Sequence, residues 1–131
     1  FRIQLPENVA VGAYDNHKFG FHKDSSPGYD HPRDEINVFL PLTRAYGTNT
    51  IWVESEEDKG DFSPMEADYG DYYIWKGSHL SHGNKLNTTK KSRVSIDFRI
   101  MPISCYKPEN YKSSRDTNKR FIIGDYYNEV V

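Results

Sequence analysis

Two histidines and one aspartate carry the chemistry that the sequence suggests first. His22 and Asp24 lie two positions apart in a strand-like run, residues 19–24, and such side chains project from the same face of a strand. His82 follows 60 positions after His22. Two imidazoles and one carboxylate are the ligand set of non-haem Fe(II) oxygenase sites, which keep coordination positions open. We therefore expect a metal centre at these residues, against the ordinary alternative that each is a plain surface or core residue.

An arginine and a serine follow on the clearest strand pattern of the chain. Arg93 lies eleven positions after His82, and polar residues at odd positions alternate with apolar residues at even positions across residues 93–100. Two interpretations are open. The polar face lies in water, or it lines a barrel interior, where Arg93 and the Ser95 hydroxyl would hold a carboxylate. Arg99 shares this face but lies roughly 13 Å from Ser95 at ~3.3 Å per residue, so we expect it to play no part at the same carboxylate.

Strands must position these residues, because helical periodicity is hard to find in this sequence. Short runs rich in β-branched and aromatic residues alternate with turn-forming clusters, which is typical of a sandwich or barrel. The polar stretch after Met101 and Pro102 is expected to run over the surface. The expected strands are residues 1–5, 18–24, 35–40, 48–55, 71–76, 79–82 and 93–101.

Length and charge narrow the class of protein further. The chain has 131 residues, 17 basic and 19 acidic side chains and a net charge of -2, so it is one domain with nothing to attract nucleic acid or an anionic membrane. A single cysteine, Cys105, cannot form an internal disulfide. The sequence has neither a signal peptide nor a long apolar run. We therefore expect a cytoplasmic protein with no membrane or nucleic-acid partner.

The order of these motifs is that of a known superfamily. His-x-Asp, a distal His and then Arg-x-Ser resemble the Fe(II)/2-oxoglutarate-dependent oxygenases, and the resemblance covers nearly the whole chain. A more specific likeness, to the streptomycin-biosynthesis hydroxylase-like subgroup, rests on residues 22–25, 31–37, 40–43, 49–55 and 92–99.

The resemblance implies a fold, a function and a set of roles. The fold would be a double-stranded β-helix, a jelly-roll or cupin-like barrel with few or no helices, as a single domain over residues 1–131. His22, Asp24 and His82 would bind Fe(II), and Arg93 with Ser95 would bind the far carboxylate of the co-substrate 2-oxoglutarate. The reaction would be hydroxylation of a small-molecule substrate.

The resemblance also raises an expectation about what supports the main sheet. Family members usually carry helices before the first His-x-Asp strand, and only 21 residues precede His22 here. We expect these helices to be lacking, or a neighbouring subunit, as in a dimer, to cover the sheet.

Several assignments stay open at this point. His79 is the alternative to His82, but it would place the arginine fourteen positions away, and the two histidines would face opposite sides of one strand. Possible pocket residues are Asn37, Asn49, Trp52 and His31. His31 and Glu35 are also a possible metal pair, although Pro32 interrupts any regular strand between them. Two other functions are also open: a cupin-like metal enzyme that does not use 2-oxoglutarate, and a non-catalytic β-barrel binding module without metal.

Overall fold

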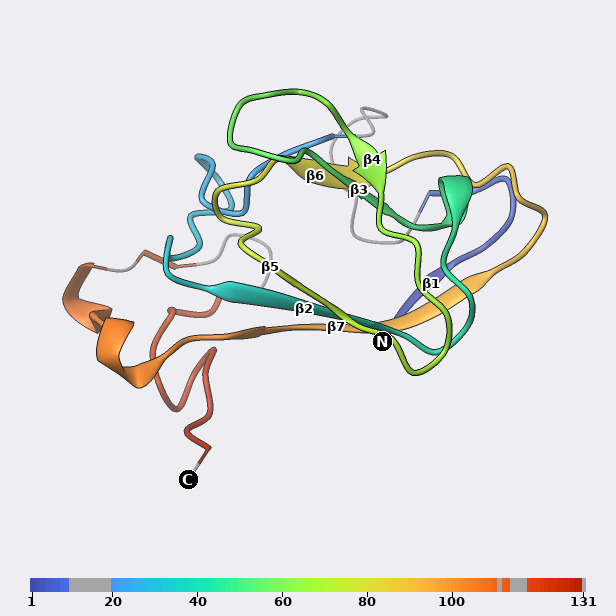
Figure 1. Ribbon diagram of the computed structural model, residues 1–131. Helices are drawn as coiled ribbons and strands as arrows, with labels where there is room; N and C mark the ends of the chain where they lie inside the picture. Colours follow the sequence, from blue (N-terminus) through green and yellow to red (C-terminus); the bar gives the residue numbers. More distant parts are fainter. Residues whose placement is uncertain (10–19, 111, 114–117, 131) are drawn as a thin grey trace.

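Two antiparallel sheets face each other in the computed structural model, which describes residues 1–9, 20–110, 112–113 and 118–130 (Figure 1). The larger sheet has the strand order β1-β7-β2-β5, and the smaller sheet has the order β4-β3-β6. The described residues contain three 3-10 turns and no α-helix. The all-β prediction is thus confirmed, and the arrangement is consistent with a cupin-like β-sandwich. The strands are β1 Arg2–Gln4, β2 Ile36–Pro41, β3 Ile51–Val53, β4 Ser63–Pro64, β5 Tyr73–Trp75, β6 His82–Asn84 and β7 Arg93–Ile100, and the turns are η1 Gly47–Asn49, η2 Ile103–Cys105 and η3 Pro108–Asn110.

A small apolar core lies within this sandwich. It is built from one aromatic ring and three smaller apolar side chains, against which two partly buried side chains pack. Burial of these groups is the main favourable contribution to folding. The apolar core fills only part of the interior, and many of the other buried side chains are polar or charged. Its members are Phe39, Ala45, Ile51 and Met65, with Val53 and Trp75 packed against them.

The inner face of β7 is polar, which decides between the two interpretations of its alternation. Arg93 and Ser95 are fully buried, whereas Phe98 and Ile100 are 45% and 44% exposed. Residues directly opposite each other in an antiparallel ladder share a face, and the β2–β7 register pairs Asp97 with the buried Phe39. The polar set of β7 therefore faces the interior, and the apolar set faces outward.

The outer face of the larger sheet is apolar on each of its four strands. Ile3 on β1 is opposite Val94, and Ile74 on β5 is opposite Val38. Ile3 and Ile74 are 50% and 57% exposed. We call this the apolar outer face.

Some expected elements differ from those observed. The strand expected at 79–82 is displaced: the N–H groups of His79 and Leu80 bond to the carbonyl of Lys76 in a turn, and β6 begins at His82. Of the strand expected at 18–24, residues 18 and 19 lie outside the described residues, and His22 forms only an isolated bridge. The two-residue β4 was not expected, because so short a run shows no alternation.

We expect the chain after Met101 and Pro102 to run over the surface, but its last part contributes to the interior. Phe121 is fully buried and packs on the His31 ring, with the ring centroids 4.5 Å apart. Tyr127 donates a hydrogen bond to the buried Glu35. A short apolar and aromatic run, residues 121–127, therefore follows the polar stretch and packs against the sandwich.

Candidate metal centre and a buried arginine

Backbone pairing brings His22 and His82 together. The N–H of each residue bonds to the carbonyl of the other, and both distances are 2.9 Å. Gly83 permits this close approach, because a Cβ at that position would lie 3.2 Å from the Cα of Phe21. The spacing of the two imidazoles is therefore set mainly by the main chain.

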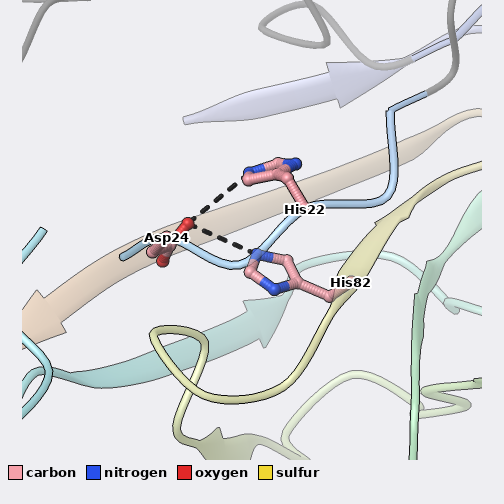
Figure 2. A group of neighbouring side chains, drawn as sticks. All are labelled: His22, Asp24 and His82. Carbon is pink, nitrogen blue, oxygen red and sulfur yellow. Dashed lines mark ion pairs between the residues drawn. The ribbon is translucent and has the colours of Figure 1, made fainter. Parts of the chain in front are cut away.

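The side chains of His22, Asp24 and His82 converge on one point (Figure 2). Nε2 of each ring lies 3.5 Å from Oδ1 of Asp24, and one ligand atom from each residue lies within 4.8 Å of the other two. Such a group can hold a divalent cation on one face and leave the opposite face open. The structure thus brings together the three residues that the sequence suggested as ligands.

Second hydrogen bonds orient the two rings. Nδ1 of His22 lies 2.9 Å from the carbonyl of Gly20, and Nδ1 of His82 lies 2.9 Å from that of Leu80. Because a carbonyl can only accept, Nδ1 donates in both cases, and in the neutral rings Nε2 carries the lone pair that a metal ion would need. This is the arrangement by which proteins commonly orient histidine ligands.

The two oxygens of Asp24 have separate partners. Oδ1 faces the histidines, whereas Oδ2 accepts hydrogen bonds from Asn37 at 2.8 Å and from Nε and Nη2 of Arg99 at 3.0 and 2.9 Å. Burial alone would raise the pKa of Asp24, but His22, Arg99, His82 and Asn37 outweigh it and hold that pKa well below its usual value. Asp24 is therefore a charged carboxylate with one oxygen aimed at the cluster.

The pKa values of the two histidines are shifted in opposite directions. Burial lowers the pKa of His82, and this effect exceeds the attraction of Asp24. Burial acts in the same direction on His22, but its contacts with Asp24 and with the Gly20 carbonyl leave its pKa raised. Because a ligating imidazole must be neutral, the lowered pKa of His82 favours the form that can bind a metal.

Arg93 is a fully buried cation whose side-chain hydrogen bonds go to an amide and whose guanidinium lies 5.4 Å from the centroid of the Phe39 ring. Nη1 and Nη2 each donate to Oδ1 of Asn84 at 3.3 Å, and Nε has no hydrogen-bond partner. No carboxylate forms an ion pair with Arg93 in the described part of the chain. Burial lowers the pKa of Arg93 to about 10. Such a guanidinium lacks the anion that usually accompanies a buried charge.

Other buried polar atoms in the sandwich also lack partners. Gln4 is opposite Arg93 in the β1–β7 register, and its buried Oε1, which can only accept, has no hydrogen-bond partner. The buried Nδ2 of Asn49, a donor, also has none. Ser95, the other residue expected at this site, is fully buried on the same face of β7 and donates to Asp97 at 3.2 Å.

Asn37 and His31 lie beside the metal cluster. Asn37 donates to Asp24 and accepts from the N–H of Gly77 at 3.0 Å, so it supports a ligand. Nδ1 of His31 lies 2.7 Å from Oε2 of the buried Glu35. His31 was expected at the pocket rim or behind the ligands, and the structure places it in the interior.

The remaining candidates have contacts of their own. Asn49 accepts from the N–H of Tyr46 at 2.7 Å, and Trp52 donates to the carbonyl of Gly47 at 2.9 Å. His79 is outside the cluster, because its ring lies against Arg33 and the exposed Glu57.

Sequence reasoning did not connect Arg99 with Asp24, and it missed Tyr127. Arg99 was expected to play no part at the carboxylate site of Ser95, and its reach to Asp24 was not considered. Arg99 holds Asp24 directly, and its Nε lies 3.6 Å from Oε2 of Glu35. His31 and Glu35 were considered as a possible metal pair, and the structure brings their side chains into contact with each other, outside the His22, Asp24 and His82 cluster.

A cavity of about 730 Å³ opens next to Arg99. It lies between the end of β7 and the C-terminal segment, and its size is that of a small-molecule pocket. Its lining is mainly apolar and aromatic and includes Phe98, Ile100, Tyr106, Tyr126 and Tyr127 together with Arg99.

The fold and site together define a cupin-like β-sandwich with a two-histidine, one-carboxylate cluster in its interior. The chain is 39% identical over 130 residues to the streptomycin biosynthesis protein StrG of Streptomyces griseus. The alignment covers 99% of this chain and 57% of StrG, so the chain spans little more than half the length of that relative. No family model matches the chain. Among the described residues, no helix has the length and apolar character needed to cross a membrane.

Proposed function

We propose that this chain is the metal-binding β-domain of an Fe(II)- and 2-oxoglutarate-dependent oxygenase that hydroxylates a small molecule. His22, Asp24 and His82 would hold the Fe(II) ion. Arg93 and Ser95 would hold the far carboxylate of 2-oxoglutarate. The observation that carries the proposal is the burial of Arg93 without a carboxylate partner in the described residues, close to an open set of metal ligands.

The strand β6 connects the two parts of this site. His82 and Asn84 lie on the same face of β6, roughly 7 Å apart at ~3.3 Å per residue. Asn84 accepts the hydrogen bonds of Arg93. A five-carbon dicarboxylate is long enough to reach from a metal at His82 to a guanidinium at Asn84. The pairing of metal ligands and arginine therefore suits a 2-oxo dicarboxylic acid.

The protein's own residues bind and orient in this scheme. Asp24 supplies negative charge through Oδ1, while Asn37 and Arg99 keep Oδ2 engaged. Leu80 holds the His82 ring through its carbonyl. Arg93 supplies a positive charge in a buried site, where an ion pair is stronger than in solution. With Fe(II) and the 2-oxo acid bound, O₂ would supply the oxidising equivalents for the hydroxylation.

A small-molecule substrate is supported by the relative. The name of StrG places that protein in the biosynthesis of streptomycin, a small molecule. Hydroxylation is a finer inference, and it rests on the ligand set and on Arg93.

Anaerobic titration with Fe(II) and 2-oxoglutarate tests the proposal. The expected result is a weak metal-to-ligand charge-transfer band in the visible for the wild type and for Glu56→Gln, a surface control. Arg93→Lys, which keeps the charge but loses the planar donor geometry, should weaken 2-oxoglutarate binding and leave Fe(II) binding unchanged.

Other outcomes point to the other functions. Fe(II) affinity that is the same with and without 2-oxoglutarate, and unchanged in Arg93→Lys, would indicate a cupin-like metal enzyme of another kind. A chain that binds no divalent metal, and in which His82→Ala changes only stability, would be a metal-free binding module. Either result contradicts the proposed oxygenase.

A further inference from the structure

The second oxygen of Asp24 belongs to a buried network that extends to the end of the chain. Oδ2 already accepts three hydrogen bonds, from Asn37 and Arg99. Coordination of a metal by both oxygens would break these bonds. The number of oxygens that Asp24 offers therefore depends on what keeps Arg99 in place.

Arg99 lies between two carboxylates. Its Nε and Nη2 donate to Asp24, and Nε is also 3.6 Å from Oε2 of Glu35. Its remaining arm, Nη1, donates to the Tyr126 hydroxyl at 3.3 Å. The guanidinium thus contacts both carboxylates, and Glu35 is its second anionic partner.

Glu35 is itself held firmly. It is fully buried, Oε2 lies 2.7 Å from Nδ1 of His31, and Oε1 accepts from the Tyr127 hydroxyl. The His31 ring packs on Phe121. A buried carboxylate with these partners cannot turn away from Arg99 without losing hydrogen bonds that no water replaces.

We propose that Glu35 is a positioning residue for Asp24, acting through Arg99. It holds the guanidinium against Oδ2, so that Asp24 presents Oδ1 alone to the metal. Tyr127 supports Glu35 and makes the C-terminal segment part of the metal site. This inference rests on the proposed metal-binding role of His22, Asp24 and His82.

Co(II) binding to the purified chain tests it without any measurement of turnover. Glu35→Gln keeps the shape of the side chain and removes its charge. We expect a dissociation constant for Co(II) raised by about tenfold or more, the usual effect of losing a group that orients a metal ligand. We also expect the d–d absorption to change in intensity, because a released Asp24 can coordinate through both oxygens.

Two further variants make the result decisive. Tyr127→Phe removes one hydrogen bond to Glu35 and should give a smaller change in the same direction, and it carries the test if Glu35→Gln does not fold. Glu56→Gln, the same substitution on an exposed side chain, should match the wild type. Thermal unfolding of the metal-free forms separates loss of fold from loss of positioning.

The outcomes distinguish the two inferences. If wild type binds Co(II), and folded Glu35→Gln and Tyr127→Phe bind it with the same affinity and spectrum, the positioning role is wrong and the metal centre stands. If wild type binds no Co(II), or binds it equally well after His82→Ala, the metal centre itself is wrong and the positioning role falls with it.

Discussion

Arg93 and Arg99 lie on the same inner face of β7, yet their surroundings are opposite. Arg99 contacts Asp24 and Glu35, and although burial alone would lower its pKa, these carboxylates and Tyr126 leave that pKa raised. Arg93 contacts the Asn84 amide, and burial lowers its pKa to about 10. One arginine therefore belongs to a network of buried carboxylates, whereas the other is attracted by Asp97 but forms no ion pair among the described residues.

The largest effect should come from removing the paired arginine. Arg99→Ala leaves Asp24 and Glu35 buried without the cation between them, and breaking such a pair costs about 3–5 kcal/mol. Denaturant unfolding of the metal-free chain measures this loss. Arg44→Ala is the control, because Arg44 and its partner Asp68 are largely exposed, and it should cost less than about 1 kcal/mol. A loss for Arg99→Ala no larger than for this control would contradict the comparison.

Removing the unpaired arginine should affect ligand binding more than folding. Arg93→Met fills a similar volume without a buried charge, so the metal-free chain should keep its unfolding free energy within about 1 kcal/mol or gain stability. With Fe(II) present, 2-oxoglutarate at 100 times its dissociation constant should stabilise the wild type by about 2.7 kcal/mol. The variant should lose this gain in a thermal-shift titration. A variant that is strongly destabilised and still responds to 2-oxoglutarate would reverse the roles of the two arginines.

The smallest effect should come from exposed ion pairs. Hydrogen bonds from Lys23 and Arg33 lower the pKa of Glu57 from 4.5 to about 2, and bonds from Ser55 lower that of Asp61 from 3.8 to about 2. Because these folded-state values are depressed, their contribution is complete above about pH 4.5 and is lost as the pH falls toward 2.

The measurement is the thermal midpoint across this pH range. Glu57→Gln should flatten the acid slope slightly, and added salt should do the same, since exposed charges are screened. The contribution of the buried Arg99 should change little with salt. If salt reduced the stability contributions of Glu57 and Arg99 equally, the distinction between exposed and buried ion pairs would be wrong.

The clustering of His22, Asp24 and His82 could be predicted because its signal is local or ordered along the chain. His22 and Asp24 share a strand-like run, and His82 precedes Arg93 at a recognisable interval. The alternation of β7 also predicted two distinct faces, but not which face is buried. Which face of β7 is buried depends on the side chains of the opposite sheet, and the alternation along β7 contains no information about them.

The supporting residues could not be predicted, for a physical reason. Glu35 and Tyr127 are 92 positions apart, and their contact exists only once the C-terminal segment closes over the sandwich. Arg99 was judged by its distance along β7 alone, although a long side chain reaches residues on other segments. The predicted start of β6 was three residues too early, because the turn after Lys76 is held by backbone hydrogen bonds that side-chain patterns do not show.

The backbone bridge between His22 and His82 also has a consequence for the order of folding. It joins residues 60 positions apart, so a long loop must close before either imidazole faces the other, and contacts of this kind form slowly. The ligand cluster therefore does not exist in the early, locally structured chain. A metal ion bound there would stabilise the completed fold and slow its unfolding, while leaving the first steps of folding unchanged.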